Sequence, residues 1–462
     1  MNYVLTDVSN HSEHDLVSCA RVGLGSNSET SHQQQPWLMA NTQRGLVLGA
    51  TALTLTTIVV TGAGILSNDS PASLNQSPKE LIDQVWQIID KQYVDATFNQ
   101  VDWVAVRDDY LGRDYNDSEQ AYEAIREMLS QLDDPYTRFM SPKEFQNMQI
   151  DTSGQLTGVG IQIAKDEETE QLMVIAPIED TPAFKAGILA KDIIIKIDGQ
   201  STEGMELNEA VDLIRGREGT QVVLTIQRGE EEKDYAITRA RIEIHPVRAR
   251  VEQTDKGKIG YIRLNQFSAN AAGEMRDAIK DLEDENVEGY ILDLRSNPGG
   301  LLNASVEIAR MFLNDGGIVS TVSRTGQQDD QRANGRNLTD EPLVILVDGG
   351  SASASEILSG ALQDNDRAVL VGTKTFGKGL VQSVRGLNDG SGLAVTIAKY
   401  LTPSGRDINK LGIEPDIKFE MTEEQRKELQ RDRTQIGTFN DPQFAEGVRV
   451  LVQEISSANA SN

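Results

Sequence analysis

The sequence has very few of the side chains that most often carry hydrolytic or metal chemistry. It holds one cysteine, Cys19, and four histidines in 462 residues. A single cysteine excludes an intrachain disulfide and any metal site built from several thiolates. Three of the histidines lie within the first 32 residues, so only His245 remains for a site further along. A zinc centre therefore lacks ligands, and a serine–histidine–aspartate triad has one candidate base.

Basic residues are also scarce. Lysine and arginine together number 44 against 71 aspartates and glutamates, which gives a formal net charge of −27 at pH 7. No basic surface large enough for a nucleic acid is implied, so we expect no nucleic-acid partner. The acidity itself favours solubility and does not identify a substrate. At this length the chain is expected to form two or three folding units.

The N-terminal region predicts a membrane segment behind a disordered tail. Residues 1–44 are polar and lack periodicity, whereas residues 45–66 carry no charge and are long enough to cross about 30 Å of hydrocarbon. Arg44 precedes this segment and Asp69 follows it, so the bulk of the chain is expected beyond the membrane. The alternatives are a buried core helix or a cleaved signal. Cys19 lies in a lipoprotein-like box, but no apolar run precedes it, and lipidation is not expected.

Periodicity divides the rest of the chain. Apolar residues recur at helical spacing over 79–93 and 118–132, and from about 152 the chain reads as short strands separated by turns. From 258 onward strands and helices alternate, which is typical of a layered α/β core. The stretch 380–401 returns to strand character around the hairpin turn Asn388-Asp389-Gly390. Past 421 we expect one helix, at about 422–432, and a small-residue tail.

One stretch, Gly349 to Ile357, places serines between an apolar strand and a helix. A hydroxyl at such a helix N-terminus would lie beside backbone N–H groups that stabilise developing negative charge. Ser353-x-x-Glu356 is equally a capping box, which requires no catalysis. The turn Asn297-Pro298-Gly299-Gly300 also follows a buried-looking strand and could present a second N–H group, although it is an ordinary turn when taken alone.

A serine nucleophile needs a base, and lysine is the alternative to histidine. His245 lies in an expected connector, where a structural or surface role is favoured. Lys378 stands between two glycines after a strand, and burial there would lower its pKa enough to make it a base. Gln382 could orient the uncharged amine. The competing interpretation is a solvated loop lysine, for which Lys374 is the natural comparison.

Residues from about 144 to 240 resemble a PDZ domain. The elements Ala186-Gly187-Ile188, Asp192-Ile193-Ile194 and Asp198-Gly199-Gln200 occur in that family's order. A PDZ groove adds an extended chain terminus as a strand and holds its carboxylate with backbone N–H groups of a glycine-containing loop. A silent groove is the alternative. The loop residues that match are Gly158, Val159, Gly160 and Ile161.

The ordered motifs together resemble the carboxyl-terminal processing peptidases, also called tail-specific serine proteases. The resemblance covers about 79 to 420. It is carried by Asp134-Pro135-Tyr136-Thr137-Arg138-Phe139, the PDZ-like segment, Asp293-Leu294-Arg295-x-Asn297-Pro298-Gly299-Gly300, Ser351-Ala352-Ser353-Ala354-Ser355-Glu356-Ile357, Thr375-Phe376-Gly377-Lys378-Gly379-x-x-Gln382 and Leu401-Thr402-Pro403-Ser404-Gly405-Arg406.

The resemblance implies a multidomain α/β fold, with a crotonase/ClpP-like protease core, an inserted PDZ domain and a helical N-terminal segment. The one transmembrane helix or signal that precedes them is inferred from the apolar run at 45–66 itself. The expected parts are a disordered tail (1–44), a membrane or signal segment (45–66), a linker (67–78), a helical part (79–148), a PDZ domain (149–240), a protease core (241–420) and a charged segment (421–462).

The family uses a serine/lysine pair, often extended by a glutamine. On the matching positions the resemblance implies Ser353 as nucleophile and Lys378 as general base, with Gln382 orienting the lysine. Asp364 matches a supporting aspartate. The oxyanion hole would combine the N–H of Ala354 with that of Gly299 or Gly300.

The implied activity is that of a serine endopeptidase that cleaves proteins near their C-terminus, with the PDZ domain holding the exposed tail. No metal and no cofactor are expected. The enzyme would be membrane-anchored through 45–66 or secreted, with its catalytic part on the periplasmic or thylakoid-lumenal side. Two alternatives remain: a silent, membrane-anchored PDZ scaffold, which has no need of a serine/lysine/glutamine set, and a crotonase-like acyl-CoA enzyme, which has no need of an inserted PDZ domain.

Overall fold

The computed structural model describes residues 77–166 and 169–461. The expected tail, the apolar segment 45–66 and all but the end of the linker lie outside the described residues. Within the described ranges, no helix combines the length and the apolar character that a membrane crossing requires.

Three helices open the described chain: α1 (Pro78–Gln92), α2 (Trp103–Gly112) and α3 (Ser118–Ser130). The side chain of Ser77 accepts a bond from the N–H of Glu80, and the Glu80 carboxylate accepts the N–H of Ser77, so α1 starts in a complete capping box. The helices predicted at 79–93 and 118–132 are confirmed. Helix α2 lies within the helical part expected at 79–148, but its own bounds were not predicted, because it buries only about one side chain per turn among acidic residues.

A short strand and a further helix connect these helices to the rest. Strand β1 (Arg138–Met140) begins within the motif 134–139, and α4 (Pro142–Ser153) begins in another capping box, between Ser141 and Glu144. The helical part expected at 79–148 includes the start of α4, but this helix was not located separately, and none of its residues is fully buried. Its weak apolar pattern explains the omission.

The PDZ-like segment is a small β-sheet with two helices. The order in the sheet is β3-β4-β5-β7-β8, with β6 on β5, while β2 pairs with β9 separately, so β3 forms an open edge. Its elements are β2 (Gln155–Gly158), β3 (Ile161–Lys165), β4 (Leu172–Pro177), α5 (Pro182–Ala186), β5 (Ile193–Ile197), β6 (Gln200–Ser201), α6 (Leu207–Ile214), β7 (Gln221–Arg228), β8 (Glu231–Thr238) and β9 (Ala240–Glu243).

The sequence over 156–163 predicted a glycine-containing turn that leads into a strand, and β3 begins after this turn at Ile161. Val159 and Gly160 separate β2 from β3, and the two strands join different sheets. Gly160 has φ +80°, and a Cβ there would lie 2.3 Å from Thr181, so both the backbone conformation and the space require glycine.

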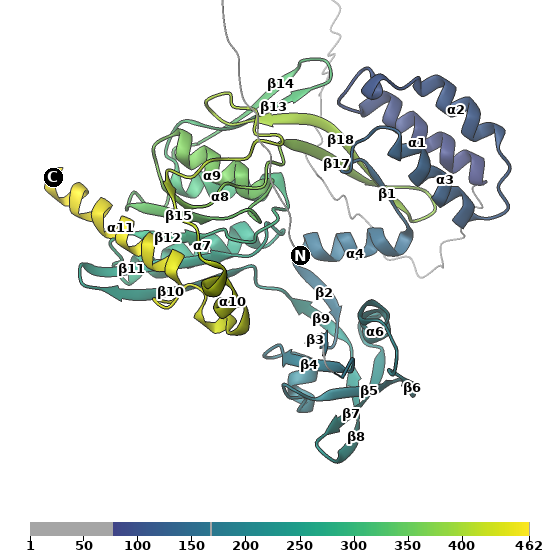
Figure 1. Ribbon diagram of the computed structural model, residues 1–462, viewed down its shortest axis with the longest axis horizontal. Helices are drawn as coiled ribbons and strands as arrows, with labels where there is room; N and C mark the ends of the chain where they lie inside the picture. The colour runs from purple at the N-terminus through teal and green to yellow at the C-terminus, as the bar shows by residue number, and fades with distance from the viewer. Residues whose placement is uncertain (1–76, 167–168, 462) are drawn as a thin grey trace, which may run out of the picture. The chain divides into compact units, whose positions relative to one another are not determined.

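The largest part is a six-stranded sheet of order β10-β11-β12-β15-β16-β19, parallel except for the antiparallel pair β10–β11 (Figure 1). This confirms the predicted alternation of strands and helices. The elements are β10 (Val247–Thr254), β11 (Gly257–Leu264), α7 (Ala271–Asp284), β12 (Tyr290–Asp293), α8 (Leu302–Phe312), β15 (Leu343–Val347), α9 (Ala354–Asp364), β16 (Val369–Gly372) and β19 (Ile417–Lys418).

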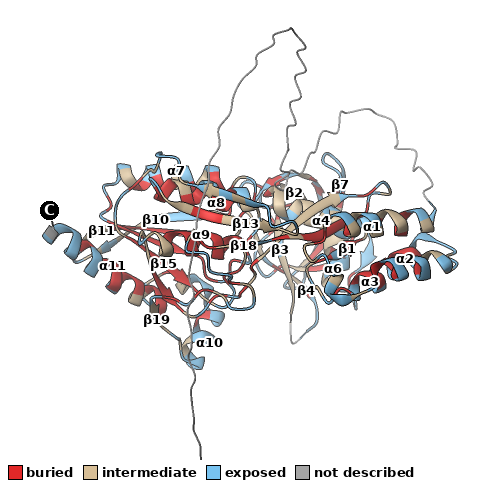
Figure 2. Cartoon of the chain, turned by 90° about the horizontal axis from the view of Figure 1, so that it is seen from above, coloured by how far each residue is buried: buried red, intermediate tan, exposed pale blue. Residues whose placement is uncertain are grey.

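The two faces of this sheet bury alternate residues of each strand. Leu292 belongs to the core with α7, α8 and α9, whereas its neighbour Ile291 belongs to the core with α11 (Pro442–Ser461). Strand β15 and helix α9 are buried along nearly their whole lengths (Figure 2). Parallel strands covered on both faces are expected to be apolar throughout, as β15 is.

The C-terminal segment needs a correction. Helix α10 (Glu423–Arg431) confirms the helix expected at 422–432, but the expected small-residue tail is instead the 20-residue helix α11. Phe444, Val448 and Leu451 of α11 are buried against the sheet. The small and polar residues after Ile455 obscured this pattern in the sequence.

A second sheet lies beside the core. It holds β1, β13 (Gly317–Ser323), β14 (Gln328–Arg332), β17 (Leu380–Gly386) and β18 (Gly392–Leu401), and β18 pairs with β1, β13 and β17. The predicted hairpin over 380–401 is therefore confirmed as β17–β18. Leu387, Leu393 and Val395 of this hairpin also belong to the apolar core of α1, α2 and α3.

The order of strands decides where the site forms. Strands β12, β15 and β16 are adjacent and parallel, and each leads at its carboxyl end into a loop with sequence-predicted functional residues. These loops are 294–300, 348–353 and 373–378. Carboxyl ends of neighbouring parallel strands meet at one edge of a sheet, which is the usual place for a ligand in an open α/β fold.

Candidate active site

Ser353 occupies a sharp turn between strand β15 and helix α9. Its φ of 54° and ψ of −111° are unusual for a residue other than glycine. Such strain costs roughly 1–3 kcal/mol and persists only where surrounding contacts enforce it. A strand–turn–helix arrangement of this kind presents a serine hydroxyl at the end of a sheet, as in a nucleophile elbow.

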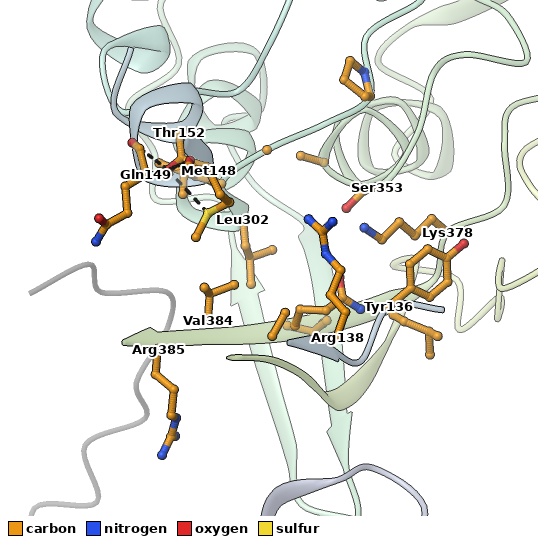
Figure 3. Close-up of a pocket in the computed structure, with 18 of the residues that line it drawn as sticks. Tyr136, Arg138, Met148, Gln149, Thr152, Leu302, Ser353, Lys378, Val384 and Arg385 are labelled. Carbon is orange, nitrogen blue, oxygen red and sulfur yellow. Dashed lines mark hydrogen bonds between the residues drawn. The ribbon is translucent and has the colours of Figure 1, made fainter. Parts of the chain in front are cut away.

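Only one of the three neighbouring serines presents its hydroxyl to a cavity. The Oγ of Ser351 donates to the carbonyl of Leu294 (2.8 Å), and the Oγ of Ser355 donates to that of Asn297 (2.9 Å); both residues are fully buried. Ser353 instead lines a cleft of about 730 Å³. In Figure 3 its hydroxyl points toward the amine of Lys378. Ser351 and Ser355 thus hold the turn together.

The buried carboxylate of Glu356 connects the serine turn to the lysine loop. It accepts the N–H of Ser353 (2.9 Å) and the N–H of Lys378 (2.9 Å), both on Oε2. Its Oε1 accepts the N–H of Gly377 (2.7 Å) and the hydroxyl of Thr375 (2.6 Å). One side chain therefore fixes the backbones of both residues, and the predicted helix-capping contact is one of four.

Lys378 is a largely enclosed amine. Burial, followed by the like charge of Arg138, lowers the pKa of Lys378 below its ordinary value, while Asp134 and Glu356 act in the opposite direction. Its Nζ lies 4.7 Å from the centre of the Tyr136 ring. The solvated-loop alternative is therefore wrong for Lys378. It fits Lys374, whose side chain is 50% exposed and pairs with Glu414 at 3.3 Å.

Tyr400, on β18, completes the contacts around the serine. Its hydroxyl donates to the carbonyl of Lys378 and hydrogen-bonds to the Ser353 side chain. Burial, with the charge of Glu356 second, raises the pKa of Tyr400 well above its usual value, so the phenol keeps its proton. This role was not predicted from the sequence, because Tyr400 precedes the Leu401–Arg406 motif and comes into place only through the pairing of β18.

The glycine turn after β12 lies directly against Ser353. A Cβ on Gly299 would lie 2.7 Å from the carbonyl of Ala352 and 2.9 Å from the N of Ala354, so only glycine permits this approach. The N–H of Gly299 donates to Oδ1 of Asn297 (2.9 Å), whereas Gly300 lines the cleft. The Asn297 amide in turn donates to the carbonyl of Leu264 (2.8 Å), which fixes the turn to β11.

A buried ion-pair network holds this turn in place. Arg295 donates to Asp293 (2.7 Å) and to Asp441 (2.7 Å). Burial opposes the ionisation of Asp293, but the charge of Arg295 outweighs it and holds the pKa of that carboxyl below its usual range. Removing one partner of such a network costs about 3–5 kcal/mol. Asp441, which lies in the C-terminal segment 421–462, therefore supports the active-site loop.

Of the other residues predicted from the sequence, Gln382 lines the cleft, whereas Asp364 and His245 do not. The amide of Gln382 donates to the hydroxyl of Thr396 at 3.5 Å. Asp364, at the end of α9, accepts the N–H of Ser404 (2.9 Å) and pairs with Arg406, away from the cleft lining. His245 has a 68% exposed side chain that bonds to Glu274 at 2.9 Å, which confirms the expected surface role.

Several residues that line the cleft were not predicted from the sequence. Arg138 of β1 points into the cleft beside Ser353 and Lys378 (Figure 3), and α4 contributes Phe145, Met148 and Gln149. Arg138 lies in a motif that carried the resemblance, but only the pairing of β1 with β18 brings it here. In the described part of the chain, no group of three or more His, Cys, Asp or Glu side chains is arranged to hold a metal ion.

The predicted PDZ loop is shaped by internal hydrogen bonds. The carbonyl of Val159 accepts the N–H of Ala183 (2.8 Å), and that of Gly160 accepts the N–H of Ile178 (2.9 Å). Gly158 ends β2, and Ile161 begins the edge strand β3. Helix α6 packs beside β3, so the open edge has a helix along it.

The comparisons with known proteins agree with this arrangement. The model of peptidase family S41 matches residues 258–419, and that of the PDZ domain matches residues 173–228. The chain is 48% identical to a carboxyl-terminal-processing protease of Synechocystis over 359 residues, 77% of this chain and 84% of that protein. It is 41% identical to carboxyl-terminal-processing peptidase 2 of Arabidopsis thaliana over 372 residues, 78% and 72% of the two chains.

One solved structure is similar over most of its length. The photosystem II D1 C-terminal processing protease matches with 38% identity and a TM-score of 0.52, covering 74% of this chain and 93% of that one. The level of identity and coverage among the curated relatives shows the family, and the silent scaffold and the acyl-CoA enzyme are set aside. The chain belongs to the carboxyl-terminal processing peptidases, which are serine peptidases of family S41, and it carries a PDZ domain.

Proposed function

We propose that Ser353 is the nucleophile and Lys378 the general base of this peptidase. The observation that carries the proposal is their convergence in one cleft, with the serine hydroxyl and the lysine amine pointing toward each other (Figure 3). The lowered pKa of Lys378 supports it, because only an uncharged amine can accept a proton.

The reaction would be acyl transfer to water. Lys378 accepts the hydroxyl proton as Oγ of Ser353 attacks the scissile carbonyl carbon, and a tetrahedral oxyanion forms. Its collapse breaks the C–N bond, and the lysine ammonium returns the proton to the leaving amine. Water, deprotonated by the same lysine, then attacks the acyl-enzyme, which releases the new carboxylate and restores the serine.

The oxyanion would be held by backbone N–H groups. The N–H of Ala354 starts helix α9, where the helix dipole adds to its effect. Of Gly299 and Gly300, we favour Gly300 as the second donor. It lines the cleft, whereas the N–H of Gly299 is already bonded to Asn297.

Gln382 and Asp364 would support the Ser353/Lys378 pair without taking part in bond making or breaking. Gln382 lines the cleft close along the chain to Lys378, and its weak bond to Thr396 would be exchanged for one to the uncharged amine. Asp364 anchors the turn after β18 through Ser404 and Arg406. That turn follows Tyr400, so Asp364 supports the site from outside.

The PDZ domain would capture the tail of the substrate. The open edge of β3 is suited to an added strand, and Gly158, Val159, Gly160 and Ile161 would hold the terminal carboxylate. One solved relative processes the D1 protein according to its name. For this chain we propose the broader class of proteins with exposed C-terminal tails.

The location would match that of the relatives. They include cyanobacterial and chloroplast enzymes. Together with the apolar segment at 45–66, this supports a membrane-anchored or secreted enzyme with its catalytic part on the periplasmic or thylakoid-lumenal side.

Replacing either member of the pair should abolish cleavage. Ser353→Ala and Lys378→Ala are each expected to lower kcat by more than about a thousandfold, because the nucleophile or its base is lost. The measurement is mass spectrometry of the products from a folded reporter with an unstructured C-terminal tail. Lys374→Ala, the exposed control, should stay within about twofold. Undiminished activity in either pair variant would refute its assigned role.

The pH profile should show a lysine that titrates below its ordinary range. Because the neutral amine is active, kcat/KM for a peptide without titratable side chains should rise with pH through the lowered pKa of Lys378. Arg138→Gln removes the neighbouring positive charge, raises that pKa and moves the limb to higher pH. A limb at about pH 6.5, typical of histidine, or one that Arg138→Gln leaves in place, contradicts the assignment.

Glu356→Gln should disrupt the pair without touching either reacting atom. An amide offers one acceptor oxygen where four donors converge, so we expect about 1–3 kcal/mol lower stability and at least about a hundredfold lower kcat. Thermal unfolding and single-turnover cleavage measure the two effects. Glu80→Gln alters the equivalent capping contact of α1 and should leave kcat unchanged; an equal loss in both variants would contradict this role.

A further inference from the structure

The charged residues that line the active-site cleft are all of one sign. They are Arg138, Lys378 and Arg385, and the described residues that line the cleft include no aspartate or glutamate. The chain as a whole carries a formal net charge of −27. Because Lys378 is proposed to act as an uncharged base, Arg138 is the lining cation beside Ser353, and its sign is opposite to the one that dominates the composition.

Arg138 is the most available of these charges. Its side chain is exposed, and Figure 3 shows its guanidinium pointing into the cleft between Ser353 and Val384. With the residues that the structure describes, it makes no hydrogen bond, ion pair or ring contact. Buried or paired arginines elsewhere, such as Arg295 and Arg228, each meet a carboxylate. A guanidinium with free N–H groups beside the reacting atoms is suited to a carboxylate of the substrate.

Arg385, the second arginine among the lining residues, does not direct its side chain into the cleft. It lies on β17 and donates one bond, to Oε1 of Gln92 (2.7 Å), while its buried Nε has no hydrogen-bond partner within the described part of the chain. In Figure 3 its side chain points away from Ser353. Arg385 is therefore directed toward α1 and does not present its charge to a ligand in the cleft.

The walls of the cleft beside Arg138 are largely apolar. Leu302 and Val384 face the cleft, and Leu301, Ile357 and Val381 also line it. The complementary ligand is therefore an extended peptide with apolar residues and a carboxylate side chain. The terminal carboxylate is not the intended partner, since the PDZ loop is proposed to hold it.

We infer that Arg138 makes this cleft selective for substrate segments with an acidic residue near the scissile bond, because its guanidinium lies close to Ser353. This inference rests on the proposed roles of Ser353 and Lys378. It names the chemistry of the segment that is cut, which the capture of a tail by the PDZ domain leaves unspecified. A charge placed opposite a complementary charge in a cleft mainly determines specificity.

The test scans one aspartate through the four residues on each side of the scissile bond, with an asparagine peptide as the isosteric reference at each position. The readout is the ratio of kcat/KM for the two peptides, measured on one enzyme preparation at one pH. This ratio does not depend on the folded fraction or on the ionisation of Lys378. We expect about a tenfold preference for aspartate at one or two positions, weakened by added salt.

Variants assign the preference to Arg138. Arg138→Gln should bring the ratio nearest the scissile bond to about one, and Arg138→Glu should invert it. Arg385→Gln should leave every ratio unchanged, because this side chain is directed away from the cleft. Arg276→Gln, an exposed arginine of α7 outside the cleft, should leave every ratio unchanged. Repeating the scan with C-terminally amidated peptides should preserve the pattern, since the proposed partner is a side chain.

The contrary results are distinct. A flat aspartate/asparagine profile in the wild-type enzyme, or an Arg138→Gln variant that retains the preference, overturns the inference. A preference that disappears on amidation shows that the cleft binds the chain terminus and overturns it as well. Failure of the catalytic proposal would be seen separately, as cleavage of the reference peptide by the Ser353→Ala enzyme.

Discussion

The carboxylate of Glu356 is the constraint on which the catalytic geometry depends. It is fully buried and is satisfied by four donors, from the serine turn and from the lysine loop. These two loops leave neighbouring parallel strands, β15 and β16, and nothing in the strands alone would fix their separation. The anion of Glu356, which accepts backbone N–H groups from both loops, fixes it together with the bond from the N–H of Phe376 to the carbonyl of Ser351 (3.1 Å). The anion also helps to enforce the strained backbone of Ser353.

The same arrangement explains how lysine takes the place of histidine. Its enclosure by Tyr136 and the walls of the cleft removes water, and Arg138 adds a like charge, so the uncharged amine is favoured. Glu356 lies near enough to oppose this shift, but its oxygens already accept bonds from backbone N–H groups of the loop. The carboxylate thereby positions the lysine while its charge is partly neutralised by other donors.

Local patterns predicted the parts of the fold that follow from neighbouring residues. Helical spacing located α1 and α3, strand–helix alternation located the core, and Ser353-x-x-Glu356 identified the capping contact. Residues that reach the site through the pairing of strands far apart in the sequence were not predicted. Arg138 enters the cleft through β1, and Tyr400 enters it through β18. The choice of Ser353 over its neighbours came from family resemblance. The structure adds a physical reason, because the hydroxyls of Ser351 and Ser355 donate hydrogen bonds to backbone carbonyls.

The most direct test of the serine/lysine account is covalent labelling with a fluorophosphonate, followed by peptide mapping and measurement of the labelling rate against pH. The account predicts phosphonylation of Ser353 alone among the three serines of its turn, with a rate that rises as Lys378 loses its proton and that collapses in Lys378→Ala. Labelling of Ser351 or Ser355, or an unchanged rate at Ser353 in the Lys378→Ala enzyme, would contradict it.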